Sequence, residues 1–130
     1  YYDLAGFADK EVAKSAQEFT DLYRAKYKAP PDAYATIAYT AYMEMFRGFE
    51  AAKSFDPKAV SAALMAGKGQ FNSVKGPARW REDHAAEYKY AAFLVKGKGA
   101  KERKDEWDLF TVLGAVGGES VLPALKSLGY

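Results

Sequence analysis

The amino-acid sequence predicts an α/β protein in which three helices are followed by strands and a short C-terminal helix. Three observations support this prediction. Apolar residues recur at helical spacing through the first half of the chain. Asp and Pro residues stand where each of these helices would begin or end. In the second half, short apolar runs alternate with glycine-containing turns, which is typical of strands.

Length and composition exclude several classes of protein. The chain has 130 residues, of which 49% are hydrophobic, so it can bury a core. Its 19 Lys and Arg against 17 Asp and Glu give a net charge of +2, so we expect no nucleic-acid partner and no acidic disordered tail. The absence of cysteine excludes disulfides, thiolate metal sites and a cysteine nucleophile. No apolar run is long enough to span a membrane.

The first helix is predicted from Lys10 to Lys28. Asp9 can cap its N-terminus, because a carboxylate accepts a hydrogen bond from an unpaired backbone N–H group. Pro30-Pro31 ends the helix, since neither proline donates a backbone hydrogen bond. One apolar stripe runs along the helix, formed by Val12, Ala16, Phe19, Tyr23 and Tyr27.

The second helix, predicted over 33–53 after the capping residue Asp32, is apolar on most of its circumference. Such a helix is buried by neighbours on several sides, and few strands precede it to supply that cover. A third helix is predicted over 57–66, because Asp56-Pro57 suits a helix start and Gly67 a helix end. Its inward residues are predicted to be Val60, Ala63 and Leu64.

The rest of the chain is predicted to be mainly extended. Strands are expected over 70–74, 78–80, 88–95 and 107–116, and a last short helix over 120–128 with Pro123 in its first turn. Gly76-Pro77 bends the chain between the first two strands, and 81–84 forms a polar turn.

Residues that could carry catalysis or bind a metal do not form a recognisable site. His84, the only histidine, lies in the polar turn and is interpreted as an exposed residue. The adjacent acidic residues Glu82 and Asp83, and likewise Asp105 and Glu106, are expected to lie in water with ordinary pKa values. We therefore predict no enzymatic activity, no metal site and no cofactor.

Two lysine-containing segments are also interpreted without a ligand. Gly97-Lys98-Gly99 lacks the spacing of a phosphate-binding loop and is predicted to be a turn. Acidic residues interrupt the basic cluster around it, which argues against phosphate-backbone binding. This cluster comprises Lys96, Lys98, Lys101, Arg103 and Lys104.

The tyrosines allow two interpretations, because the ring suits both a small-molecule pocket and a packed core. For Tyr34, Tyr39 and Tyr42 on the second helix we favour core packing. For Tyr1 and Tyr2, at the start of the chain, the residues alone do not decide between the two.

The order of four segments resembles a known family. These segments are Phe19–Tyr27 with Pro30-Pro31 after it, Ala38–Tyr42, Val60–Leu64 with Asp56-Pro57 before it, and Phe71–Trp80 leading into the strand over 88–95. They resemble the C-terminal part of type I periplasmic solute-binding proteins, in particular the branched-chain amino-acid family of ABC importers. The resemblance covers roughly residues 10–96. Thr40 replaces a frequent Asp of the family, and His84 lies in a turn that usually carries Asp and Gly.

The resemblance implies a two-lobed protein with mainly parallel sheets, in which the chain crosses between the lobes and the ligand binds in the cleft. Residues 1–130 are then expected to be a C-terminal fragment. Residues 10–66 would be the helical part of one lobe, and 67–130 a strand-rich part that reaches the other lobe. Tyr1 and Tyr2 would lie nearest the second crossover, which makes them the candidate ligand-binding residues.

The implied function is the substrate-binding component of an ABC importer for branched-chain or related amino acids, amides or small carboxylates. Its partners would be the solute and the permease subunits, in the periplasm or at a lipid anchor. Because the second helix is so apolar, we also expect the fragment to self-associate. A ligand-sensing domain of the same fold in a regulator or receptor, and an independent protein-interaction module, are the alternatives.

Overall fold

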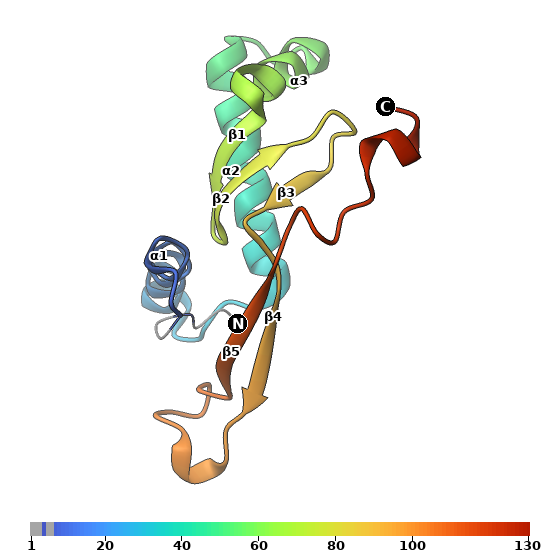
Figure 1. Cartoon of the computed structure of the whole chain (residues 1–130). Coiled ribbons are helices and arrows are strands. Elements are labelled where there is room, and N and C mark those ends of the chain that lie inside the picture. The colour runs from blue at the N-terminus through green and yellow to red at the C-terminus, as the bar shows by residue number, and fades with distance from the viewer. Residues whose placement is uncertain (1–3, 5–6) are drawn as a thin grey trace.

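A computed structural model describes Leu4 and residues 7–130 of the chain (Figure 1). Within these residues, three α-helices come first: α1 (Lys10–Tyr27), α2 (Ala33–Ala52) and α3 (Pro57–Met65). Five strands follow: β1 (Gln70–Ser73), β2 (Gly76–Trp80), β3 (Ala86–Tyr88), β4 (Tyr90–Gly97) and β5 (Phe110–Gly117). Three short 3₁₀ helices complete the described part: η1 (Ala66–Gly69), η2 (Ala100–Glu102) and η3 (Leu125–Leu128). The predicted α/β class, with helices before strands, is confirmed.

The helix starts are where the sequence places them. Asp9, Asp32 and Asp56 each accept a hydrogen bond from the backbone N–H three residues on, at 3.3, 2.7 and 2.9 Å. Each carboxylate thereby satisfies one of the backbone donors that a helix start leaves unpaired. The three helices end within one residue of the predicted positions.

The strands form two separate antiparallel sheets. β1, β2 and β3 make one sheet in that order, and β4 pairs with β5 in a two-stranded ribbon. Figure 1 shows this ribbon extending away from the three-stranded sheet. Every pairing among the described strands is antiparallel, so these strands do not themselves form the parallel sheets that the resemblance implies.

Three predictions about the second half are wrong. The bend expected at Gly76-Pro77 lies at 74–75, because Gly76 and Pro77 already pair with β1 as the first residues of β2. The single strand expected over 88–95 is divided at Lys89 into β3 and β4, because the chain leaves one sheet there and enters the other. The helix expected over 120–128 is reduced to η3. Pro123 has no backbone N–H and disfavours a helical conformation at the residue before it, so the helix cannot form through this point.

The core lies where α1 meets the strands. Leu4, Val12, Ala13 and Ala16 form its buried cluster, and side chains of the β4–β5 ribbon pack against them. The predicted stripe of α1 is therefore confirmed in its first half. It fails at its end, where Tyr27 is 55% exposed.

α2 is covered on one narrow face only, although its composition predicts cover on several sides. The residues that the described elements cover are Thr36, Glu44 and Gly48. Its large apolar side chains face solvent, and Tyr34 and Tyr42 are 81% and 60% exposed. The neighbours expected to bury this helix on several sides are therefore not among the described elements.

Candidate functional site

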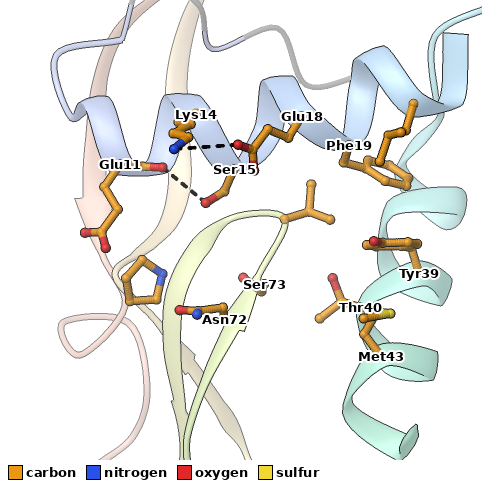
Figure 2. Close-up of a pocket in the computed structure, with 13 residues that line it drawn as sticks. Glu11, Lys14, Ser15, Glu18, Phe19, Tyr39, Thr40, Met43, Asn72 and Ser73 are labelled. Carbon is orange, nitrogen blue, oxygen red and sulfur yellow. Dashed lines mark hydrogen bonds and ion pairs between the residues drawn. The ribbon is translucent and has the colours of Figure 1, made fainter. Parts of the chain in front are cut away.

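A groove lies between α1, α2 and the β1–β2 hairpin (Figure 2). It holds about 430 Å³, which is within the usual size range of small-molecule sites. Glu11, Lys14 and Glu18 of α1 form one wall, and Tyr39 of α2 lies on the opposite one. Ser73 of β1 lines its floor.

Several hydrophilic side chains of this groove already bond within the protein. The Ser15 hydroxyl donates to the Glu11 carbonyl at 3.1 Å, and the Ser73 hydroxyl donates to the Gly76 carbonyl at 2.8 Å. Lys14 pairs with Glu18 at 3.7 Å, with both side chains well exposed. The groove therefore presents no buried charge that would hold a ligand strongly.

The helix tyrosines divide into two groups. Tyr39 packs one side of its ring on Phe19, with centroids 4.7 Å apart, but it stays 41% exposed and so is not a core residue. Tyr34 and Tyr42 lie on the solvent side of α2, so core packing is wrong for them within the described part of the chain. Tyr1 and Tyr2 lie outside the described residues.

A polar cluster, which we call the Asp9 cluster, joins α1 to the passage between the sheets. It comprises Asp9, Lys89 and Tyr90. The Asp9 carboxylate accepts hydrogen bonds from the Lys89 ammonium at 2.6 Å and from the Tyr90 hydroxyl at 3.1 Å. The bond from Lys89 holds the pKa of Asp9 below its ordinary value, and Asp9 raises the pKa of Lys89. Burial, reinforced by Asp9, raises the pKa of Tyr90.

Sequence reasoning identified Asp9 only as a helix cap and did not single out Lys89. The hydrogen-bonding partners Asp9 and Tyr90 are 81 positions apart, so no local pattern reveals the cluster. A charged residue within an otherwise apolar predicted strand was the available signal.

A second polar contact joins the helices to the three-stranded sheet. Glu44, buried on α2, accepts two hydrogen bonds from Arg47 at 2.9 and 2.8 Å. Its carboxylate also accepts the indole N–H of Trp80 in β2 at 3.0 Å. No local pattern in the sequence reveals this contact, because Glu44 is simply one charge on an apolar helix.

The loop residues behave partly as predicted. His84 is exposed, as expected, and takes a left-handed backbone conformation with φ of 62°. The expectation of an ordinary pKa is wrong for Asp83, because the Arg81 guanidinium bonded to it at 2.6 Å lowers the pKa of that carboxyl. Lys98 of the basic cluster pairs with Asp108 at 2.6 Å, so part of that positive charge is neutralised. Lys98 and Gly99 begin the connection between β4 and β5, as predicted, whereas Gly97 is still part of β4 and pairs with Phe110.

Neither a metal centre nor a membrane span is found in the described part of the chain. No group of three or more His, Asp or Glu side chains among residues 4 and 7–130 could hold a metal ion. No described helix is both long and apolar enough to cross a membrane.

The sequence profile of the periplasmic binding protein family matches residues 2–101. The chain belongs to this family. Comparison with curated protein sequences finds no match.

Solved structures of periplasmic binding proteins share the fold. A periplasmic binding protein from Burkholderia mallei is 21% identical, with a TM-score of 0.75, and covers 97% of this chain. A branched-chain amino-acid ABC transporter periplasmic ligand-binding protein from Burkholderia xenovorans is 23% identical, also with a TM-score of 0.75, over 87% of this chain. An amino-acid ABC transporter substrate-binding protein from Pseudomonas fluorescens is 25% identical, with a TM-score of 0.72, over 87% of this chain.

These relatives are much longer than the matched region. The chain spans 31%, 29% and 29% of the three structures, respectively.

Proposed function

We propose that the natural protein containing residues 1–130 is the solute-binding component of an ABC importer. The observation that carries this proposal is the family match over residues 2–101. It is supported by the two relatives described as transporter ligand-binding or substrate-binding proteins. The protein would work in the periplasm, free or held by a lipid anchor, and would deliver its solute to permease subunits without catalysing a reaction.

The proposed solute is a branched-chain or related amino acid, an amide or a small carboxylate. The Burkholderia xenovorans relative is described as a branched-chain amino-acid transporter component. A solute-binding protein from Rhodopseudomonas palustris, 22% identical with a TM-score of 0.61, was solved with benzoate. A carboxylate is the group that these two kinds of solute share.

In this proposal 10–66 belongs to one lobe, 67–130 reaches the other, and the solute lies in a cleft between them. Tyr1 and Tyr2 stay proposed ligand-binding residues. Tyr34 joins them, because it is 81% exposed in the first turn of α2. An exposed tyrosine ring offers a flat apolar face and a polar tip, which suits contact with a small solute.

The test measures solute binding by the natural protein. After co-purified solute has been removed by unfolding and refolding, its melting temperature is followed with leucine, isoleucine, valine, their amides and benzoate. We expect one of these classes to raise the melting temperature, because a ligand that binds only the folded state stabilises it. If no class does so at millimolar concentration, the proposed solute class is wrong.

The role of Tyr34 is tested by calorimetry with the solute identified in this way. Tyr34→Ala should raise the Kd about tenfold or more, as expected for the loss of an aromatic contact. Phe55→Ala is the matched control, because Phe55 is equally exposed, at 82%, but follows the other end of α2. An equal effect of both substitutions would contradict a specific contact at Tyr34.

A further inference from the structure

Two passages of the chain run side by side between the two sheets. Lys89 is the single residue between β3 and β4, and Gly118 follows the end of β5. The two passages are joined, because the Gly118 N–H donates to the Lys89 carbonyl at 3.2 Å. Figure 1 shows the β4–β5 ribbon leaving the three-stranded sheet at this point.

The passages are packed too closely for the chain to slide at this point. A Cβ atom added to Gly118 would overlap the carbonyl of Tyr88, so only glycine fits there. The Lys89 N–H also donates to the Pro77 carbonyl, at 3.4 Å. Backbone contacts therefore hold the two passages together at this point.

The Asp9 cluster supplies side-chain contacts at the same point. One oxygen of the Asp9 carboxylate accepts the Val12 N–H in the first turn of α1. The other oxygen accepts from Lys89, in the passage, and from Tyr90, at the start of the ribbon. A single carboxylate thus ties α1 to the passage and to the ribbon.

The cluster combines a fixed part with a part that can separate. The Tyr90 ring packs edge-on against Phe7, with centroids 5.2 Å apart, and joins the core formed by α1 and the ribbon. The Lys89 side chain is 47% exposed, so water can replace its bond to Asp9 at small cost. The Asp9–Lys89 bond is therefore the contact that can open without unfolding the core.

We propose that Asp9 is a positioning residue that acts through Lys89 as a latch on the angle between the ribbon and the three-stranded sheet. The role given to this angle rests on the proposed function, because a solute-binding protein that closes around its ligand must change the angle between its lobes. With the latch intact, one angle is favoured. When the latch is lost, the ribbon samples further angles and the balance between open and closed protein shifts.

The test measures the angle directly, without a solute. Residues 1–130 contain no cysteine, and any cysteine elsewhere in the natural protein is first replaced by serine. Spin labels can then be placed at Lys58→Cys in α3 and Lys96→Cys in β4, which are both exposed. Pulsed electron paramagnetic resonance (double electron–electron resonance) on the natural protein then gives the distribution of distances between the two labels. We expect Asp9→Asn and Lys89→Met each to broaden this distribution, and the double variant to add little, because both substitutions remove the same bond.

Two further variants separate a latch from a purely structural role. Asp56→Asn changes the same residue type at the cap of α3, without a contact to the passage, and should leave the distribution unchanged. Lys89→Arg keeps a cation that can bond to Asp9, so this variant should keep the narrow distance distribution of the wild type. If Asp9→Asn lowers the melting temperature but the distribution keeps its wild-type width, Asp9 is only a helix cap and the latch is refuted.

Solute binding provides a second readout. Lys89→Met should change the Kd of the natural protein for its solute by about threefold, the size expected for one partly exposed ion pair. An unchanged Kd combined with a broadened distribution would refute the link between the angle and binding. If no solute is found at all, the proposed function fails. The distance measurement still tests the latch, because it needs no solute.

Discussion

Replacing Glu44 by alanine should weaken the attachment of α2 to the three-stranded sheet and so reduce the free energy of unfolding. The Glu44 side chain is 7% exposed and accepts three hydrogen bonds, two from Arg47 and one from Trp80. Of these, the bond from the Trp80 indole, at 3.0 Å, joins the helix to β2. The substitution removes all three bonds and leaves their donors without an acceptor.

The expected loss follows from the exposure of those donors. Breaking a buried ion pair by removing one partner costs about 3–5 kcal/mol, because the other charge stays buried. The Arg47 side chain is 34% exposed and recovers part of its hydration after the substitution. The expected cost therefore lies at or below the lower end of that range. We expect Glu44→Ala to reduce the free energy of unfolding by about 2–3 kcal/mol, a large part of the 5–15 kcal/mol typical of a domain.

The assay is urea unfolding followed by tryptophan fluorescence, with Trp107→Phe in every variant so that Trp80 reports on the site. With a denaturant slope of about 2–3 kcal/mol/M, the unfolding midpoint should fall by about 1 M. Glu50→Ala is the matched control, because Glu50 lies on the same helix and is exposed. It should leave the midpoint nearly unchanged.

A double-mutant cycle gives the refutation. Trp80→Phe keeps most of the aromatic area but removes the indole N–H, so its effect and that of Glu44→Ala should not be additive. All members of this cycle are followed by far-ultraviolet circular dichroism, because Trp80→Phe removes the fluorescent reporter. If the two effects add fully, or if Glu44→Ala costs no more than Glu50→Ala, the carboxylate does not hold the helix to the sheet.

Two further predictions concern the strand-rich half. Gly118→Ala should destabilise the protein by about 3 kcal/mol in chemical unfolding, because its methyl group overlaps the Tyr88 carbonyl. Gly97→Ala, whose Cβ meets nothing within 4 Å, should be tolerated, and similar losses in both would contradict the packing argument. The bond from Lys98 lowers the pKa of Asp108 below 3.8, so this pair stabilises the fold above that pH. Its contribution is lost as the pH falls through the lower pKa of the folded state. Lys98→Met should flatten the dependence of stability on pH in this acidic range, and an unchanged profile would exclude the pair as its source.

Helix positions could be predicted from the sequence because their causes are local. Asp9, Asp32 and Asp56 cap the helices that follow them, and each makes its bond only three residues along the chain. The division of the strand at Lys89 could not be predicted in the same way. Apolar alternation shows that a segment is extended, but not which sheet each residue joins.

The candidate residues show the same distinction. The exposed position of His84 was predicted from its polar neighbours, whereas the roles of Glu44 and Lys89 depend on contacts 36 and about 80 positions away, respectively. The expectation of core packing for Tyr34 failed because composition states that a helix has apolar area, but not which neighbour covers it.

The sequence by itself determined the order of helices and strands, the helix caps and the resemblance to the periplasmic binding proteins. Local backbone preferences and the spacing of apolar residues are sufficient for these features. Only the tertiary structure decided which sheet each strand joins, which face of α2 is covered and which side chains meet at the passage between the sheets. These features depend on segments far apart in the chain, and their contacts exist only once packing has brought those segments together.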